Sequence, residues 1–436
     1  MKKKSIIIIG GGFTGLSAAY ELIQKKFDVT IIESEKSIGG LAGSFDVQTS
    51  KLDKFYHHWF TNDVHAIQLI KDLKLETRLL KKPTNTSMYY SNNFFKLSSP
   101  LDLMKFTPLK FTDRLRLGFL AIMARRIKHW KTLENITAKE WLIKIAGFNV
   151  YKVVWEPLLI GKFGTYADKI SAVWFWNKIK LRGSSRGKKG QEELIYFKGS
   201  FQSFAEEISN SVKLLGGKII LNCPVVSISK KNDKWAVSSV GKTYFADYVL
   251  VTTALPIFTN FIKKWADSSY INKLNKIPYL ANICLILELK KPLSDIYWLN
   301  INDPNFPFVA IIEHTNLDSK SNYSNSSIVY LSKYLPFNDR LYKMTSKEVM
   351  EYSIPYIKKM FPLFSKKNII NYYLWKARFA QPVVLKNYST LIPSELTPYP
   401  NLYLSTMAQI YPEDRGTNYA IRQGRNIASK IADNSF

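Results

Sequence analysis

The chain has 436 residues, of which 62 are Lys or Arg and 34 are Asp or Glu, so its formal net charge is +28. With 46% hydrophobic residues and two cysteines, it can build a sizeable core of about two or three domains, which excludes a disordered basic protein and a disulfide-stapled miniprotein. Lysine dominates the surplus along the whole length, whereas bidentate recognition of phosphates and bases favours arginine, so we expect no nucleic-acid partner.

The first residues predict neither a secretory signal nor a membrane span. Three lysines at positions 2–4 precede an apolar run, but Gly10 ends that run before it reaches the length of a signal core. Nowhere do about 18 apolar residues follow one another. Cys223 and Cys284 stand far apart, and no His, Cys or acidic cluster has metal-ligand spacing. We therefore expect a cytoplasmic protein without a metal site.

A glycine turn between two strand-like runs is the most informative motif. Residues 5–9 predict a buried strand, Gly10, Gly12 and Gly15 follow, residues 13–24 have helical periodicity, and residues 28–32 predict a second strand that ends before Glu33. This order is typical of a dinucleotide-binding unit, in which the glycines let a pyrophosphate approach the helix N-terminus and the acid accepts hydrogen bonds from a ribose. Around the turn, the candidate cofactor residues are Gly10, Gly12, Phe13, Thr14, Gly15, Glu33 and Ser34.

A second glycine-rich loop comes directly after the second strand. It contains Gly39, Gly40, Leu41 and Ala42, and two neighbouring glycine loops suit an extended dinucleotide, although glycines also serve ordinary turns. An aromatic segment with the pair His57 and His58 follows. Two interpretations of this pair stay open, namely packed, hydrogen-bonded imidazoles and side chains of a reaction site.

The region 91–195 has mainly helical patterns, with a capping box predicted at Thr137 and Glu140. Within it, residues 101–131 combine apolar side chains with many basic ones. Such a segment can lie on a membrane interface or cover an internal cavity, so a peripheral membrane contact is one of two open interpretations. Residues 183–187 match the G-x-S-x-G pattern of serine hydrolases, but no apolar strand enters this basic, glycine-rich loop, so the match is discounted.

The glycine motif with Glu33 and the loop at 39–44 resemble the FAD-binding start of a superfamily. It contains flavin amine oxidases, protoporphyrinogen oxidases, phytoene desaturases and UDP-galactopyranose mutases. The end of the chain resembles the same superfamily, since a strand-like run at 401–405 precedes Gly416 and a final helix. A block at 155–164, with Lys162, resembles bacterial protoporphyrinogen-oxidase-like proteins, and the paired histidines resemble the mutase branch.

The resemblance implies further flavin-binding residues. Residues 216–228 resemble the strand whose valine, here Val225, contacts the adenine region, and residues 246–254, with Thr252 and Thr253, resemble the strand that rejoins the dinucleotide fold. One departure concerns the usual Gly-Asp pair after the C-terminal strand, which is Ala408-Gln409 here and puts the contact to the ribityl chain in doubt. In the C-terminal segment, the implied flavin neighbours are Asp414, Arg415, Gly416, Asn418 and Tyr419.

The expected fold is α/β, a Rossmann-like FAD-binding domain interleaved with an α+β substrate-binding domain. The FAD-binding parts are expected at 1–90, 196–256 and 376–436. Between them we expect a helical region that faces substrate or membrane at 91–195 and a substrate-binding sheet with a helix at 257–375. In the second insert, residues 346–360 predict a helix.

The resemblance implies an FAD-dependent oxidoreductase that dehydrogenates an apolar or polycyclic substrate by hydride transfer to flavin N5. His57, His58, Arg378 and Tyr411 are the expected lining of the site. Since neither cysteine lies in the C-terminal flavin segment, we expect noncovalent FAD. The alternative is a mutase-like isomerase in which reduced FAD attacks a nucleotide sugar. The expected partner is a small lipophilic or anionic substrate.

Overall fold

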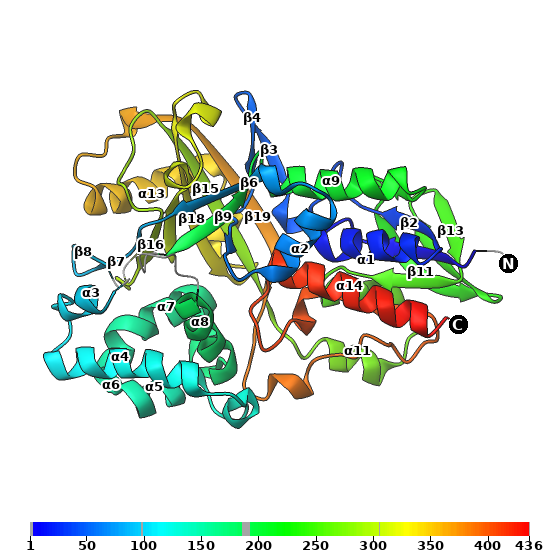
Figure 1. Cartoon of the computed structure of the whole chain (residues 1–436), viewed down its shortest axis with the longest axis horizontal. Coiled ribbons are helices and arrows are strands. Elements are labelled where there is room, and N and C mark those ends of the chain that lie inside the picture. The colour runs from blue at the N-terminus through cyan, green and yellow to red at the C-terminus, as the bar shows by residue number, and fades with distance from the viewer. Residues whose placement is uncertain (1–2, 97–98, 185–191, 305, 436) are drawn as a thin grey trace.

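A five-stranded parallel sheet forms the centre of the dinucleotide-binding part of the computed structural model, which describes residues 3–96, 99–184, 192–304 and 306–435 (Figure 1). Its strand order is β10-β2-β1-β14-β20, and all neighbours are parallel. Three distant segments of the chain supply these strands, and the strands predicted at 5–9 and 28–32 are confirmed. The bounds are β1 (Ser5–Ile9), β2 (Asp28–Ile32), β10 (Lys218–Ile220), β14 (Tyr248–Val251) and β20 (Leu402–Leu404).

The isoleucines of β1 explain why this strand is apolar at every position. Ile6 and Ile8 pack in the core cluster of the helices α1 (Phe13–Gln24), α9 (Phe201–Leu214) and α14 (Thr417–Asp433). Ile7 and Ile9 belong to the cluster on the opposite face. Because successive side chains of a strand alternate between faces, a strand covered on both faces has no polar position. In Figure 1 the three helices lie side by side across the sheet.

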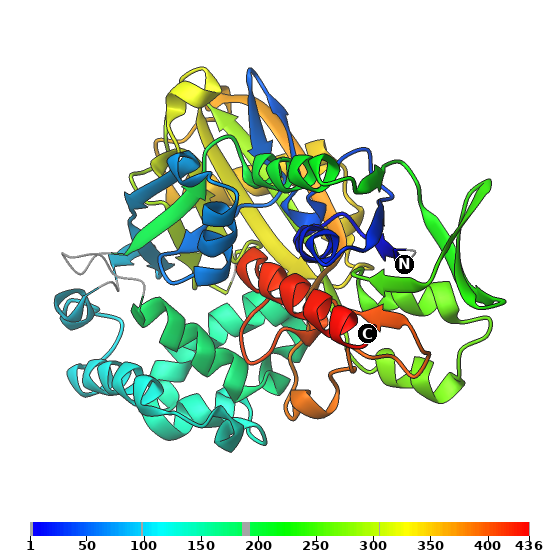
Figure 2. The same cartoon turned by 45° about the vertical axis from the view of Figure 1, so that its right-hand side comes forward.

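The opposite face of the sheet is covered by an antiparallel three-stranded sheet and a short helix. The small sheet has the order β11-β12-β13, and Figure 2 shows it at the right, extending away from the parallel sheet. Its side chains share the core cluster with the helix next to it. The bounds are β11 (Val225–Lys231), β12 (Lys234–Ser239), β13 (Lys242–Ala246) and α10 (Leu255–Ile262).

A seven-stranded sheet forms the second part of the molecule. Its order is β19-β15-β18-β17-β16-β7-β8, and only the pair β16 and β7 is parallel. The helix α13 (Ser346–Met360), predicted from the sequence, covers its outer face. The strand bounds are β7 (Thr86–Tyr90), β8 (Asn93–Lys96), β15 (Tyr279–Leu289), β16 (Trp298–Ile301), β17 (Ala310–Glu313), β18 (Ser327–Leu335) and β19 (Ile369–Pro382).

The third part is a group of helices that lies below the seven-stranded sheet in Figures 1 and 2. The predicted capping box of α5 is present, since Thr137 and Glu140 each accept a hydrogen bond from the other's backbone N–H. A π-helical turn at Tyr151–Trp155 joins α6 to α7, and Pro157, which has no N–H, lies in the first turn of α7. The helices are α3 (Pro100–Met104), α4 (Phe111–Arg126), α5 (Ala138–Ala146), α6 (Phe148–Val150), α7 (Glu156–Phe163) and α8 (Ala172–Ser184).

The interleaved α/β architecture agrees with the expected fold class, but three expected boundaries need correction. β7 lies before the boundary at residue 90 and pairs with β16, because it completes the seven-stranded sheet. β19 continues past residue 375, as a long strand paired with β15. Most of α10 lies within the expected substrate part, but this helix packs on β11 of the dinucleotide-binding part. Among the described residues, no helix is long and apolar enough to span a membrane, and no group of three potential metal ligands occurs.

Candidate active site

The glycine turn between β1 and α1 has the geometry of a phosphate cradle. Gly10 has φ of +114°, which favours glycine, and a Cβ on Gly15 would lie 2.0 Å from the Gly10 carbonyl oxygen. A Cβ on Gly12 would meet no atom within 4 Å. The first turn of α1 has no side-chain cap, so its backbone N–H groups face this open space. The turn is therefore tight toward the protein and open toward a ligand.

Glu33 and the second glycine loop lie against the turn. Glu33 is buried, accepts a hydrogen bond of 2.6 Å from the Gly11 N–H and another of 3.1 Å from the Ser34 hydroxyl. The Gly39 N–H donates to the Gly11 carbonyl, and a Cβ on Gly40 would lie 3.4 Å from the Gly12 Cα. Leu41 and the buried Ala42 continue this loop as a short 3₁₀ turn.

Two further segments reach the same turn. The Thr252 hydroxyl donates to the Ile9 carbonyl, while the buried Thr253 hydroxyl beside it has no hydrogen-bond partner among the described residues. The N–H of Cys223 donates to the Glu33 carbonyl, which brings Val225, the first residue of β11, near the end of β2. A buried hydroxyl without a partner beside an open glycine turn is consistent with a bound phosphate group.

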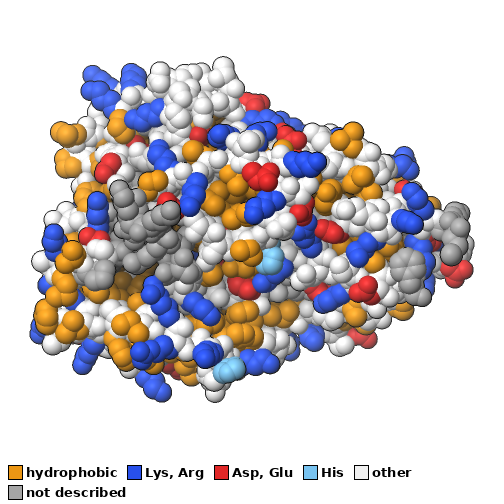
Figure 3. All heavy atoms as spheres, in the orientation of Figure 1, with side chains coloured by type: hydrophobic (Ala, Val, Ile, Leu, Met, Phe, Trp, Pro, Cys, Tyr) orange, Lys and Arg blue, Asp and Glu red, His pale blue; other side chains and the backbone are white. Residues whose placement is uncertain are grey.

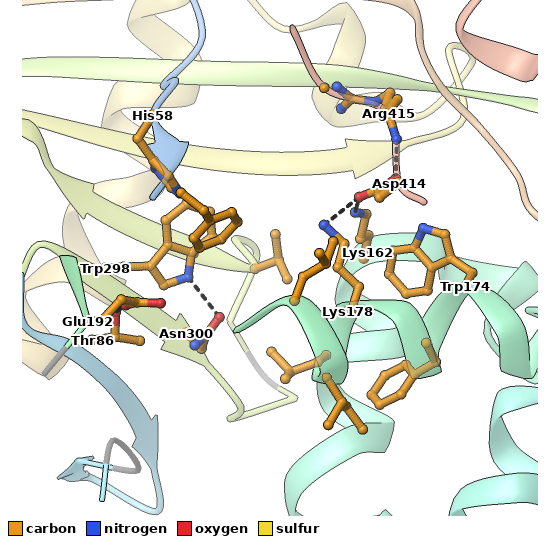
Figure 4. Close-up of a pocket in the computed structure, with 18 of the residues that line it drawn as sticks. His58, Thr86, Lys162, Trp174, Lys178, Glu192, Trp298, Asn300, Asp414 and Arg415 are labelled. Atoms are coloured by element: carbon orange, nitrogen blue, oxygen red, sulfur yellow. Dashed lines mark hydrogen bonds and ion pairs between the residues drawn. The ribbon is translucent and has the colours of Figure 1, made fainter. Parts of the chain in front are cut away.

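A cavity of about 550 Å³ lies where the three parts of the molecule meet (Figure 4). Apolar and aromatic side chains form most of its wall, together with His57 and His58. The segment 414–419 also lines it, and this segment leads into α14, which packs on α1. The aromatic residues of the wall are Tyr56, Trp59, Phe60, Trp155, Phe163, Trp174, Phe175, Trp298, Tyr334 and Tyr419.

Two lysines and Asp414 form the cationic end of this cavity. The ammonium groups of Lys162 on α7 and Lys178 on α8 lie 3.1 and 2.7 Å from the same Asp414 oxygen. Burial alone would raise the pKa of Asp414, but Lys162, Lys178 and Arg415 hold it well below the usual range. Both ammonium groups also lie over the ring of Trp174, at 4.6 and 5.7 Å from its centroid.

Arg415 and His57 lie beside this cluster. The Arg415 guanidinium donates to the Gln381 amide oxygen and the Tyr334 hydroxyl. Burial, with a further contribution from Arg415, lowers the pKa of His57 to about 4, so the imidazole is neutral at pH 7. Its Nδ1 lies 2.6 Å from the Phe55 carbonyl oxygen. Because a carbonyl only accepts, Nδ1 carries the hydrogen and Nε2 is left as an acceptor.

At the other end of the cavity, the described side chains are mainly polar or aromatic. His58 Nδ1 lies 3.0 Å from the Tyr297 hydroxyl, and its ring packs edge-on against Trp298. The indole N–H of Trp298 donates to Asn300, and Thr86 donates to the carboxylate of Glu192 at 2.6 Å. In Figure 4 these side chains face the lysines across the cavity.

The N-terminus of α14 lines the cavity with residues that the family resemblance implies as flavin neighbours. Gly416 and Tyr419 line the wall, and α14 has no side-chain cap at Gly416. Asn418 also binds another helix, because its amide oxygen accepts hydrogen bonds from the N–H groups of His65 and Ala66 at the start of α2 (Val64–Asp72). The Asn418 side chain therefore holds the start of α2. The backbone of this turn is then available to a ligand in the cavity.

Two predicted site residues lie elsewhere. Arg378 is exposed on β19, and its guanidinium stacks on Phe337 and Phe379. The hydroxyl of Tyr411 lies 2.8 Å from Glu134, to which it donates, in a cluster with Trp130 and Tyr388. Neither residue lines the cavity, so the prediction that both belong to the site is corrected.

The two doubtful motifs have different outcomes. Gln409 does not face a ligand, because its amide bonds the backbone of Thr406, Leu404 and Pro393. The hydrolase-like pattern at 183–187 lies largely outside the described residues.

The chain belongs to the family of flavin containing amine oxidoreductases, whose profile matches residues 13–432. It is therefore an FAD-dependent oxidoreductase, and the glycine turn, Glu33 and the buried hydroxyl of Thr253 fit the dinucleotide of its flavin. The comparisons give no support to the mutase alternative.

The similar curated proteins include several oxidases. The coproporphyrinogen III oxidases of Staphylococcus aureus and Bacillus subtilis are 26% and 25% identical over 66% and 65% of this chain, and the matches cover 68% and 66% of their own length. Flavin-containing amine oxidase B of Cavia porcellus is 25% identical over 58% of this chain, and this match spans half of its length.

Solved structures show the same fold over the whole chain. A protein from Exiguobacterium sp. 255-15 that is assigned as a protoporphyrinogen oxidase superposes with a TM-score of 0.79 at 16% identity, with 100% of both chains covered. Putrescine oxidase bound to putrescine superposes with a TM-score of 0.72 at 15% identity, over 99% of both chains.

Sequence reasoning missed the residues that distant segments bring to the cavity. Lys178, Trp174, Trp298 and Glu192 carry no motif, although the run 172–176 with two tryptophans marks a deeply buried helix, in which a following lysine stands out. Lys162 lies in a block that resembles the family, but its pairing with Asp414 depends on tertiary structure.

Gly12 offers a test of the cofactor cradle that separates binding from folding. In Gly12→Ala the new methyl group meets no protein atom, so the melting temperature of the flavin-free protein should stay within about 1 °C of wild type, whereas the methyl fills the space before the helix N-terminus. We expect FAD to bind at least about tenfold more weakly, a loss of about 1.4 kcal/mol. Titration calorimetry and thermal melts measure both quantities.

Gly118→Ala in α4 is the matched control, because its methyl group makes only an ordinary contact of 3.4 Å with Leu103. It should leave FAD affinity unchanged. Equal FAD affinity of Gly12→Ala and wild type would contradict the cradle.

Proposed function

We propose that the protein oxidises a flat, apolar ring system that carries carboxylates, with a porphyrinogen as the substrate class, and that it holds FAD without a covalent bond. The observation that carries this proposal is the pair Lys162 and Lys178 at one end of an aromatic cavity, beside the segment 414–419. The aromatic wall suits a ring system, and the ammonium groups of Lys162 and Lys178, whose side chains are 20% and 38% exposed, can form charge-assisted hydrogen bonds with carboxylates.

The size of the cavity and the relatives support the same substrate class. About 550 Å³ lies within the range of 300–1,000 Å³ that small-molecule sites occupy. The substrate in the name of the Staphylococcus aureus and Bacillus subtilis relatives is a macrocycle with several carboxylates. A cationic amine suits this cavity less well, because Lys162, Lys178 and Arg415 repel it from one end.

The chain's own residues bind and orient the substrate, while the flavin supplies the hydride acceptor at N5. Lys162 and Lys178 fix the carboxylate end, so that the ring lies along the aromatic wall. The neutral His57 offers Nε2 as an acceptor for a substrate N–H group. Because hydride transfer needs no acid or base on the protein, the proton that the substrate loses can leave to water.

Anaerobic mixing of the oxidised holoenzyme with coproporphyrinogen III tests the function. We expect the visible flavin band to bleach as the substrate becomes oxidised, and we expect benzylamine to leave it unchanged. A mutase would need its flavin reduced beforehand and would not bleach. If dithionite bleaches the flavin but no porphyrinogen does, the proposed substrate class is wrong.

Lys178→Met tests the role of the cationic end. One lost charge-assisted hydrogen bond should raise the half-saturating concentration of coproporphyrinogen III by about tenfold or more. Etioporphyrinogen, which has the same macrocycle without carboxylates, should be affected less than about twofold. Lys180→Met, which removes a lysine over the Trp176 ring on the same helix, is the matched control. Equal losses for both substrates would contradict a contact to carboxylates.

Heat precipitation tests the noncovalent attachment. Of the two cysteines, Cys223 lies next to Glu33 and Cys284 is fully buried within β15. Neither side chain is in the 414–419 segment, so we expect all FAD to stay in the supernatant after the protein is precipitated. Flavin absorbance in the washed pellet would show a covalent bond.

A further inference from the structure

The helix α4 has a second apolar face that points to solvent. Phe111, Leu115, Phe119 and Ile122 are 50–56% exposed, and their spacing of four, four and three residues places them in one row along the helix. The face that packs against the neighbouring helices holds Leu117, Leu120 and Ala124 instead. Leu101 and Met104 of α3 are also exposed, at 75% and 37%. We call these six exposed side chains the α3–α4 apolar row.

Basic side chains surround this row. Residues 101–131 contain eight Lys or Arg and two Asp, a net charge of +6. Of the two acids, Asp113 is buried and lies 3.6 Å from Arg116. Figure 3 shows orange and blue side chains interspersed at the lower left, where α3 and α4 lie in Figure 1. The exposed basic residues are Lys105, Lys110, Arg116, Arg125, Arg126, Lys128 and Lys131.

The cavity reaches the same helix. Ala121 and Arg125 line the cavity. Because an α-helix turns by about 100° per residue, these two residues lie on α4 between its buried face and the exposed row. The aliphatic residues Leu158, Ile179 and Leu181 line the same cavity. A molecule that lies along the α3–α4 apolar row is therefore next to the cavity.

From these observations we infer that the α3–α4 apolar row docks on the surface of a bilayer that contains anionic phospholipids. Apolar side chains in a row enter the acyl boundary, and the surrounding lysines and arginines contact phosphate groups. A second copy of this chain fits the row less well, since pairing two such rows would place one segment of net charge +6 against another of the same charge. The docking orients the cavity toward the membrane, which suits substrates that partition into lipid.

Vesicle sedimentation of the holoenzyme tests this docking. We expect binding to vesicles of phosphatidylcholine with a quarter of phosphatidylglycerol, weaker binding in high salt, and little binding to pure phosphatidylcholine. The double substitution Leu115→Asp with Phe119→Asp should reduce the partition coefficient at least about tenfold, because it places two charges in the acyl boundary. Neither residue lines the cavity, so flavin reduction by a substrate dissolved in detergent should stay as in wild type.

The matched control is Leu214→Asp with Leu363→Asp, which changes two leucines of 87% and 101% exposure outside the row. These variants should bind vesicles like wild type. Equal vesicle binding by both double variants, or no binding of wild type to anionic vesicles, would overturn the proposal. So would a dimer in sedimentation equilibrium that the row variant alone abolishes without any vesicle binding. Activity in detergent is measured separately, so a failed docking test leaves the proposed function untouched.

Discussion

The carboxylate of Asp414 is held where the three parts of the molecule meet. Lys162 and Lys178 reach it from two helices of the insert, and its neighbour Arg415 bonds side chains of β18 and β19 in the seven-stranded sheet. Asp414 itself belongs to the segment that opens α14. A buried carboxylate without its cations costs about 3–5 kcal/mol, so this contact fixes how the helices stand relative to the flavin segment.

The same contact gives the cavity its chemical character. Two ammonium groups and a guanidinium surround one carboxylate. Three positive charges against one negative charge make the electrostatic potential at this end of the cavity positive. The opposite end has the pairs Trp298 with Asn300 and Thr86 with Glu192. Basic side chains therefore gather at the cavity and along the α3–α4 surface, and Figure 3 shows others dispersed over the face that it draws.

The parts of the structure that follow from local rules could be predicted from the sequence. A stretch of about thirty residues contains the β1 isoleucines, the Gly10 to Gly15 turn and Glu33, and steric limits within this stretch determine their places. The Thr137 capping box involves only the four residues from Thr137 to Glu140. The predicted roles of Arg378 and Tyr411 failed for the opposite reason. Their segments approach the site, but strand alternation and the Tyr411–Glu134 hydrogen bond turn the side chains away. Lys178 and Trp298 reach the cavity only through tertiary packing, which no short motif encodes.

A double-mutant cycle between Asp414 and Lys162 tests most directly whether this buried contact joins the parts of the molecule. The free energy of unfolding in urea is measured for Asp414→Asn, Lys162→Met and the double variant. We expect the two losses of stability to be strongly non-additive, with a coupling energy of at least about 1 kcal/mol, because each substitution removes the same contact. Additive losses would contradict it, since Asp414 and Lys162 would then stabilise the fold independently.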